Sequence, residues 1–288
     1  MKRPFLIVLI LQTICFSCFS QTKWALIVAV GTYPQESGWT TINSDNDLKI
    51  LLPQFERLGF KVKTLVNEEA TKKHIQQALN HLTKQIQLND EVCLHFSCHG
   101  QQMEDTNGDE PDGLDEALIP YDARLTYRKG VYEGENHLRD DELETYLNAI
   151  RRKIGENGSL TVTLDACHSG TATREEEYVE DDDAPVRGST HIFSTNPFYI
   201  VPDNRQVVRK VQYKSETGLS PITVISACQP FQLNFETHVD GNYYGTLSYA
   251  YYKVLNSLDA WSTTCYPAIV QQTSRLTRRQ IPMVESTK

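Results

Sequence analysis

The sequence predicts an α/β protein with a mostly parallel sheet, and two observations carry this prediction. Short apolar and β-branched runs alternate along the chain with amphipathic segments of about ten to eighteen residues. Strands that alternate with helices of this length form parallel sheets covered on both faces. Two of the apolar runs also end in reactive side chains followed by glycine. Ligands bind such sheets at the carboxyl ends of the strands, so we expect the functional site there.

The individual elements follow from periodicity and from the residues that end them. The buried run Trp24–Val30 stops at Gly31, and the helical pattern that ends at Leu58 is closed by Gly59. On the same grounds, strands are expected at residues 23–32, 61–66, 91–96, 160–164 and 222–226. Helices are expected at residues 43–58, 71–87, 140–154 and 246–258.

Composition excludes several classes of protein. The 288 residues are 40% hydrophobic and 23% charged, which is unlike disordered, collagenous or multi-span membrane chains. The length suits one large domain or two small ones. With 28 basic and 37 acidic residues the net charge is -9, so nucleic acid and acidic membranes are not expected partners.

Residues 1–20 have the pattern of a secretory signal peptide. Lys2 and Arg3 precede an apolar run from Phe5 to Phe16, and small residues stand just before Gln21. We expect a secreted or periplasmic protein, with one domain over residues 21–288 and no membrane span once the peptide is removed. An N-terminal anchor left in place is the alternative.

The cysteines indicate a reactive thiol rather than a disulfide framework. Beyond residue 20 the chain has five of them: Cys93, Cys98, Cys167, Cys228 and Cys265. An odd number in an exported protein leaves at least one thiol outside intramolecular disulfides, and such a thiol is a candidate nucleophile. None of the five forms a CxxC pair, so a zinc ribbon or a thioredoxin-type site is not expected.

Two predicted strands end in reactive side chains that we expect to form one site. One runs into Ser97-Cys98-His99-Gly100, and the other runs into Asp165-Ala166-Cys167-His168-Ser169-Gly170. Neighbouring strand ends would bring Cys167 close to His99, and an imidazole beside a thiol lowers its pKa from about 8.5 and acts as its base. A buried structural cysteine and a zinc site made by these Cys and His residues are the alternatives.

These motifs resemble the metacaspases, which are caspase-like cysteine peptidases. The pair of motifs matches their catalytic pair, and the likeness extends from about Lys23 to Leu258. Residues 42–47, the acidic stretch 105–116, Asp140-Asp141 and residues 225–228 match further family segments. The resemblance implies a caspase-like fold with a central, mostly parallel six-stranded sheet and helices on both faces. It also implies a large-subunit-like region at 21–172, a linker at 173–220 and a small-subunit-like region at 221–288.

The resemblance also assigns roles to residues. It implies that His99 and Cys167 form a catalytic dyad, with the backbone amides of Gly100 and Cys167 holding the oxyanion. It places Asp47, Ser97 and Asp165 in a pocket for the residue before the cut bond. Carboxylates there select arginine by bidentate hydrogen bonds and lysine by charge, so the expected partners are polypeptides with Arg or Lys at the cleavage position. Asp165 has a second reading, as a carboxylate that caps its own turn.

Calcium is the cofactor that the resemblance implies, and no organic cofactor is expected. Many metacaspases are activated by Ca²⁺, and the matching residues here are Asp112, Asp115, Asp140 and Asp141. Hard oxygen ligands at this density suit Ca²⁺, although the spacing lacks the glycine of an EF-hand loop. A solvated acidic loop that binds no metal is the alternative.

The linker offers sites at which the chain could cut itself. Family members that process themselves do so after Lys or Arg in this region, and the candidates are Arg174, Arg187, Arg205, Arg209, Lys210 and Lys214. The sequence thus predicts a monomeric cysteine endopeptidase that cuts after Arg or Lys, with calcium activation and self-processing as further expectations. A caspase-fold scaffold with an idle dyad, a calcium-binding module and a peptide ligase that uses the same acyl-enzyme remain open.

Overall fold

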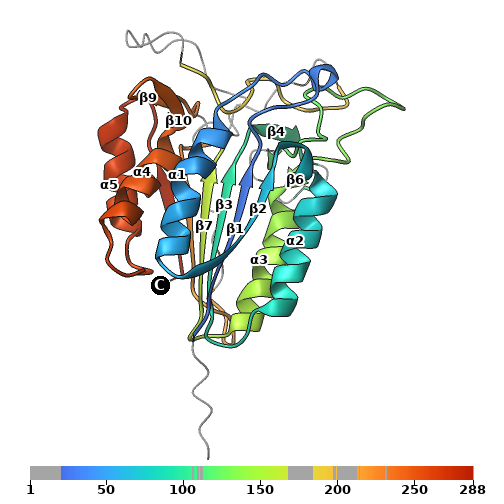
Figure 1. Cartoon of the computed structure of the whole chain (residues 1–288). Coiled ribbons are helices and arrows are strands. Elements are labelled where there is room, and N and C mark those ends of the chain that lie inside the picture. The colour runs from blue at the N-terminus through green and yellow to red at the C-terminus, as the bar shows by residue number, and fades with distance from the viewer. Residues whose placement is uncertain are drawn as a thin grey trace, which may run out of the picture.

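The computed structural model describes residues 21–105, 107–108, 110, 113–167, 184–196, 199, 213, 215–230 and 232–287. Six strands form the central sheet in the order β11-β8-β7-β3-β1-β2 (Figure 1). Their bounds are β1 Lys23–Ala29, β2 Phe60–Val66, β3 Glu91–Ser97, β7 Ser159–Asp165, β8 Ile222–Ser226 and β11 Met283–Ser286. All neighbouring pairs are parallel except β11 with β8. The sheet is therefore mixed and mostly parallel, as the sequence predicts.

Helices cover both faces of this sheet (Figure 1). Helices α2 (Lys72–Gln85) and α3 (Asp140–Ile154) pack on one face, where Leu79 and Ile150 join the side chains of β1, β3 and β7 in one core cluster. Helices α1 (Ser44–Arg57), α4 (Thr246–Ser257) and α5 (Tyr266–Leu276) pack on the other face around Phe55 and Tyr251. The two apolar layers hold the strands rigidly and leave their carboxyl ends to carry the site.

The sequence explains where the helices begin and end. Thr71 caps α2 by accepting a hydrogen bond from the His74 amide. Helix α3 has three acidic residues in its first turn and three basic residues in its last, which matches the helix dipole at both ends. It stops at Gly155, whose φ of 68° is left-handed and favours glycine.

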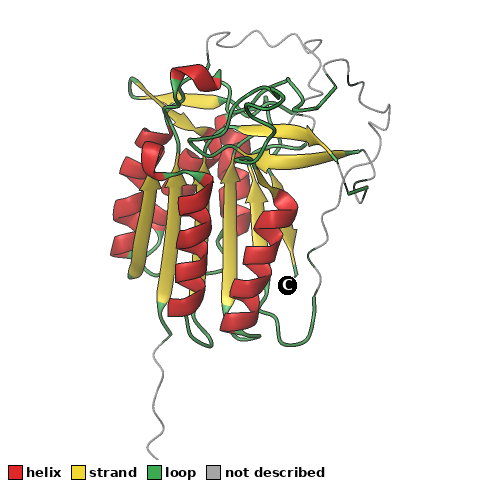
Figure 2. Cartoon of the chain, turned by 90° about the vertical axis from the view of Figure 1, so that its right-hand side faces the viewer, coloured by secondary structure: helices red, strands yellow, loops and turns green. Residues whose placement is uncertain are grey.

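Two smaller sheets cross the carboxyl end of the central sheet (Figure 2). One has the order β4-β5-β6, formed by Gly100–Glu104, Leu114–Leu118 and Leu138–Arg139. The other is the hairpin of β9 (Glu236–Val239) and β10 (Asn242–Gly245). These two sheets, β11 and α5 are not predicted from the sequence. The strands among them are short and lack a clear alternation of apolar and polar residues.

The predicted strands and helices all occur, with ends within about three residues of the predicted ones. Residues 1–20, and with them the expected signal peptide, lie outside the described residues. Within the part of the chain that the structure describes, no helix is both long and apolar enough to cross a membrane.

The packing of α2 on the sheet makes a stability prediction. Leu79 is fully buried in the core, whereas Leu88, just beyond the helix, is 66% exposed. Leu79→Ala removes buried methyl groups and leaves a cavity, so it should lower the free energy of unfolding in urea by about 2–5 kcal/mol. Leu88→Ala is the control and should change it by less than about 0.5 kcal/mol. Equal effects would show that α2 does not cover the sheet.

Candidate active site

Cys167 lies two residues beyond the end of β7, between the carboxyl ends of β3 and β8. Its side chain is fully buried, and its thiol donates a hydrogen bond to the carbonyl oxygen of Gln232 at 3.1 Å. The five cysteines from Cys93 onward are all reduced. The end of the strand therefore holds a thiol at a fixed position rather than on a mobile loop.

His99 is oriented so that one ring nitrogen is left for chemistry. Its Nε2 is 2.9 Å from the carbonyl oxygen of Thr40. A carbonyl only accepts hydrogen bonds, so Nε2 carries the proton of the neutral ring and Nδ1 has the lone pair. Nδ1 is buried and makes no hydrogen bond. The ring stacks on Trp39 with 4.8 Å between centroids, which fixes its plane. Nδ1 is thus the unprotonated nitrogen of a ring that is fixed in one orientation.

Burial keeps this imidazole neutral. Removal from water lowers the pKa of His99 to about 4, the bond to Thr40 opposes this, and the nearby Arg187 cation lowers it further. At neutral pH the ring is therefore unprotonated and able to accept a proton.

A guanidinium occupies the pocket predicted from the sequence. Arg187 is fully buried, although arginine is seldom so without partners. Its Nη1 lies 2.7 Å from the Asp47 carboxylate and 2.7 Å from the Ser97 hydroxyl. The hydroxyl of Ser97 in turn donates to Asp47. Asp165 is farther away, with its carboxylate 3.8 Å from the same nitrogen.

A carboxylate that the sequence analysis missed binds the other edge of the guanidinium. Nε and Nη2 of Arg187 both donate to Oε1 of Glu236, at 3.1 and 2.8 Å. Asn43 fixes this carboxylate through its amide and its side chain. Glu236 begins β9, and no motif marks it in the sequence, because its role appears only when the β9–β10 hairpin folds over the strand ends.

Asp165 borders the predicted pocket, and its hydrogen bonds to described residues go to partners distant in sequence, so the capping of its own turn stays a prediction. One carboxylate oxygen accepts hydrogen bonds from the amide and hydroxyl of Ser248, at 2.7 and 2.6 Å, and the other accepts one from Asn234 at 2.7 Å. Asp165 therefore ties β7 to the start of α4 and adds negative charge behind the pocket, while Asp47 and Glu236 make the direct contacts.

The backbone around Arg187 pairs like an added strand. Its amide donates to the carbonyl of Asn234 at 2.9 Å, and the amide of Glu236 donates to the carbonyl of Pro185 at 2.9 Å. Val186 and Phe235 form the antiparallel bridge between these two bonds. Such pairing fixes the register of the segment, so Arg187 has one defined position along the edge.

The peptide bond after Arg187 lies directly over Cys167. The carbonyl oxygen of Arg187 accepts a hydrogen bond from the Cys167 amide at 2.7 Å. A Cβ at the next residue, Gly188, would lie 2.5 Å from the Cys167 carbonyl oxygen and 2.7 Å from its Cβ. Only glycine permits this approach. The Arg187 carbonyl therefore rests on the backbone amide of the residue that carries the thiol, which is the position that an oxyanion donor would have.

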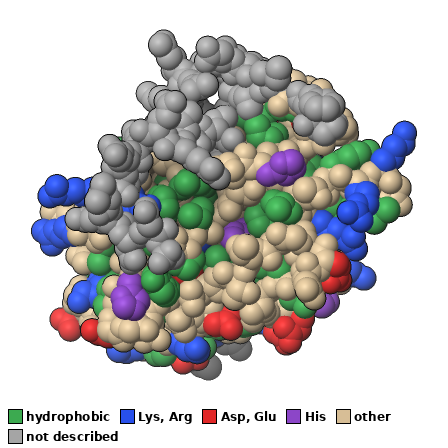
Figure 3. Space-filling view, turned by 90° about the horizontal axis from the view of Figure 1, so that it is seen from above, with side chains coloured by type: hydrophobic (Ala, Val, Ile, Leu, Met, Phe, Trp, Pro, Cys, Tyr) green, Lys and Arg blue, Asp and Glu red, His purple; other side chains and the backbone are tan. Residues whose placement is uncertain are grey.

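Gly245 borders the Arg187 pocket at a point where a side chain would not fit. A Cβ at Gly245 would contact the Asp165 carboxylate and would lie 2.5 Å from Nη1 of Arg187. The amide of Gly245 donates to Asp47 at 2.9 Å and orients it. Figure 3 shows this end of the molecule from above, with hydrophobic and histidine side chains near its centre. Arg187 itself is buried beneath that surface.

The residues expected to bind calcium lie apart from this pocket. Asp115 is ion-paired with Arg139, and Asp141 accepts a hydrogen bond from Asn107 at 3.0 Å. The pKa of Asp140 is raised to about 7, first by burial and then by the neighbouring Asp141 and Glu110 carboxylates. Asp112 lies outside the described residues. Among those that are described, no three His, Cys, Asp or Glu side chains converge as a metal site requires.

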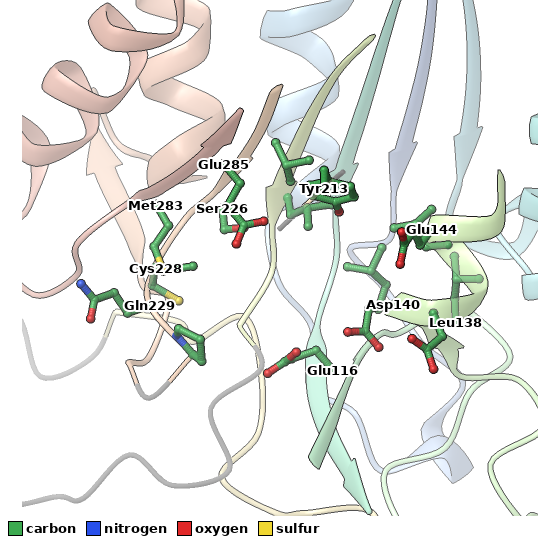
Figure 4. Close-up of a pocket in the computed structure, with 16 residues that line it drawn as sticks. Glu116, Leu138, Asp140, Glu144, Tyr213, Ser226, Cys228, Gln229, Met283 and Glu285 are labelled. Atoms are coloured by element: carbon green, nitrogen blue, oxygen red, sulfur yellow. The ribbon is translucent and has the colours of Figure 1, made fainter. Parts of the chain in front are cut away.

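A cavity of about 100 Å³ lies between this acidic region and β8 (Figure 4). Glu116, Asp140 and Glu144 line one side, and Cys228, Gln229 and Met283 line the other. The expected calcium ligands thus border a cavity, but the described residues do not fit a complete site.

The comparison with protein families decides what kind of protein this is. A model of the caspase domain matches residues 22–288. The chain belongs to the caspase domain family, a family of cysteine peptidases.

Curated relatives of this caspase-domain chain are metacaspases. Metacaspase-1B of Neosartorya fischeri is 29% identical over 218 residues, which are 68% of this chain and 49% of the relative. Metacaspase-1 of Pyricularia oryzae is 30% identical over 163 residues, which are 54% of this chain and 38% of the relative. The chain thus spans about half, or less than half, of the length of these curated relatives.

A solved structure shares the fold. The crystal structure of protein GSU0716 from Geobacter sulfurreducens matches with a TM-score of 0.63 and 24% identity, covering 92% of this chain and 93% of that one. At that identity the likeness concerns the fold alone, and it supports a caspase-like arrangement of the mixed six-stranded sheet.

The structure brings together the predicted pocket residues, whereas the pairing of His99 with Cys167 stays a prediction. Asp47, Ser97 and Asp165 surround one guanidinium, and the Cys167 amide binds the carbonyl of the same residue. Gly100 begins β4, and its expected role as the second oxyanion donor stays a prediction. Of the six candidate cleavage positions, Arg187 alone is a described residue.

The buried state of His99 makes a pH-dependent prediction. Its folded pKa of about 4 lies below the ordinary 6.5, so the unfolded chain binds more protons between these values and stability falls as pH drops from 7 to 5. His99→Gln removes this contribution. Between pH 7 and pH 5 the variant should therefore lose about 2 kcal/mol less unfolding free energy than the unaltered chain loses. Equal losses in urea titrations at the two pH values would contradict the neutral buried ring.

Proposed function

We propose that this protein is a cysteine endopeptidase that cuts after arginine, and after lysine more slowly, and that its first substrate is its own Arg187–Gly188 bond. The observation that carries the proposal is the position of Arg187. Its side chain fills the acidic pocket and its carbonyl oxygen rests on the Cys167 amide. A bound peptide substrate would need the same two contacts.

The chemistry follows from the groups around this bond. Nδ1 of His99 accepts the thiol proton, and the thiolate of Cys167 attacks the carbonyl carbon of Arg187. The oxygen becomes an oxyanion, stabilised by the Cys167 amide and, on the sequence prediction, by that of Gly100. The imidazolium then gives its proton to the Gly188 nitrogen, which leaves as an amine. Water hydrolyses the thioester, with His99 again as base, and frees Cys167.

The same geometry supports latency before the cut. While Arg187 occupies the pocket, no other arginine can reach Asp47 and Glu236. Cleavage frees Gly188 from its close contact with Cys167 and lets the segment leave. A peptide ligase would follow if an amine rather than water attacked the thioester. A scaffold protein would leave the bond intact.

Self-cleavage is the first test. The purified chain should give a new N-terminus at Gly188, detected by mass spectrometry, because Arg187 alone has the required contacts among the described candidates. Cys167→Ala should remain uncut, and Arg187→Ala should lose this cleavage. Arg205→Ala, at another arginine of the linker, is the matched control and should cut normally. A Gly188 terminus that persists in Arg187→Ala or in Cys167→Ala would contradict the proposal.

The pocket also predicts a preference between basic residues. Glu236 and Asp47 bind opposite edges of the guanidinium, and the single ammonium of lysine cannot bridge both. Arginine peptides should therefore have a kcat/KM at least about tenfold above that of matched lysine peptides, equal to about 1.4 kcal/mol.

Glu236→Gln should remove most of this preference. The substitution should lower kcat/KM for arginine peptides by about 10- to 100-fold, the worth of a charged hydrogen bond, and for lysine peptides by less. Asp240→Asn makes the same change of charge at the exposed turn of that hairpin and should alter neither value. Equal losses for both peptides would show that Glu236 does not discriminate.

We further propose that calcium acts at Asp140 and Asp141, with its remaining ligands from residues such as Asp112. Burial first, and the Asp141 and Glu110 carboxylates next, raise the pKa of Asp140, and a cation bound there would offset both effects. Millimolar Ca²⁺ should increase arginine-peptide hydrolysis over a chelator control, and Asp141→Asn should lose the increase but keep the calcium-free rate. An unchanged rate in calcium and in chelator would exclude this role.

A further inference from the structure

A second cysteine lies beside the nucleophile. Strands β7 and β8 are parallel neighbours that stay paired as far as Leu164 and Ser226, and the amide of Ala227 extends the pairing to Leu164. Cys167 and Cys228 follow directly after these strands. This register places Cys228 opposite Ala166, one residue before Cys167. An inter-strand spacing of about 4.8 Å and an offset of about 3.3 Å along the strand keep the pair within the Cα separation of about 4.4–6.8 Å that a disulfide needs.

The two thiols converge on one acceptor. Sγ of Cys167 lies 3.1 Å from the carbonyl oxygen of Gln232, and Sγ of Cys228 lies 3.3 Å from the same oxygen. A hydrogen bond to Cys167, together with burial, raises the pKa of the Cys228 thiol well above its ordinary value. Cys93 packs near Cys265 in the cluster around Phe55 and Tyr251. Cys98 follows β3, and its amide donates to the Asp165 carbonyl at 3.4 Å, but its side chain belongs to the core cluster covered by α2 and α3.

Small molecules have a route to this pair. Cys228 lines the cavity between β8 and the start of α3, and its sulfur is drawn beside Gln229 and Met283 in Figure 4. Cys167 and Cys228 are only 0% and 6% exposed, so large reagents are excluded while a peroxide can enter from the cavity.

We propose that Cys228 is a resolving cysteine, which forms a reversible disulfide with Cys167 when the peptidase meets a hydroperoxide. The inference rests on the proposed function in that Cys167 is taken to be the nucleophile. The disulfide would switch the peptidase off and would keep its sulfur from irreversible oxidation to sulfinic acid.

The chemistry balances in two steps. The Cys167 thiolate attacks one oxygen of hydrogen peroxide, the O–O bond breaks, and protonation of the leaving hydroxide gives water and a sulfenic acid at Cys167. The sulfur of Cys228 then attacks the sulfenic sulfur, its proton joins the departing hydroxide as a second water, and the S–S bond forms. The two thiols lose two electrons in total, and the peroxide is reduced. A dithiol restores both cysteines.

The test combines mass spectrometry with activity. The reduced, processed protein is treated with equimolar hydrogen peroxide, its remaining thiols are alkylated, and its peptides are mapped before and after dithiothreitol. We expect a Cys167–Cys228 cross-link, loss of arginine-peptide hydrolysis, and recovery of at least about 80% of it with dithiothreitol, in line with reversible disulfide exchange.

Variants separate the resolving role from general sensitivity. In a second series with excess peroxide, because the step from sulfenic to sulfinic acid consumes a second equivalent, Cys228→Ser should lose activity without recovery and accumulate sulfinic acid at Cys167. Cys265→Ser should behave like the unaltered chain in both series. Recovery in Cys228→Ser, or a cross-link between other cysteines, would overturn the inference. A chain that forms the Cys167–Cys228 cross-link but never cleaves arginine peptides would overturn the proposed function and leave the thiol pair standing. If Cys228→Ser fails to fold, the peptide map of the unaltered chain decides alone.

Discussion

The buried guanidinium of Arg187 is the interaction on which the rest of the site depends. Removing one arginine from water costs several kcal/mol, and three carboxylates offset that cost here: Asp47 and Glu236 in direct contact and Asp165 behind them. Without a cation these carboxylates would repel one another, and burial already raises the pKa of Asp47 to about 6 despite the arginine. The pocket is therefore built to hold a positive side chain.

The fold supplies this pocket from five separate segments. The pocket residues are Asp47 from α1, Ser97 from the end of β3, Asp165 from the end of β7, Glu236 from β9 and Gly245 from the end of β10. The parallel sheet aligns the ends of β3 and β7. The Asp165 contacts with Ser248 and Asn234 bring the β9–β10 region over these strand ends. The backbone pairing of residues 185–187 with 234–236 sets the register of the Arg187 segment. Specificity and the position of the cut bond thus come from one set of contacts.

Sequence reasoning reached the sheet and the motif residues because their signals are local. Short apolar runs predict the strands β1, β2, β3, β7 and β8, and helical patterns predict α1 to α4. Cys167 and His99 stand in short motifs after two of these strands. It missed β9 and β10, since a short hairpin has no strong sequence pattern. It therefore missed Glu236, whose carboxylate is identified as part of the pocket only by its contact with Arg187. It named six basic residues in the linker without choosing among them, because long-range backbone pairing is invisible in one sequence.

The most direct test follows peptidase activity and linker cleavage in one sample. The chain is made by cell-free synthesis, and both readouts are followed from the start of synthesis. The account predicts that hydrolysis of an arginine peptide rises in step with the new N-terminus at Gly188, since Arg187 must leave the pocket first. Full peptide hydrolysis from the uncut chain, before any Gly188 terminus appears, would contradict it.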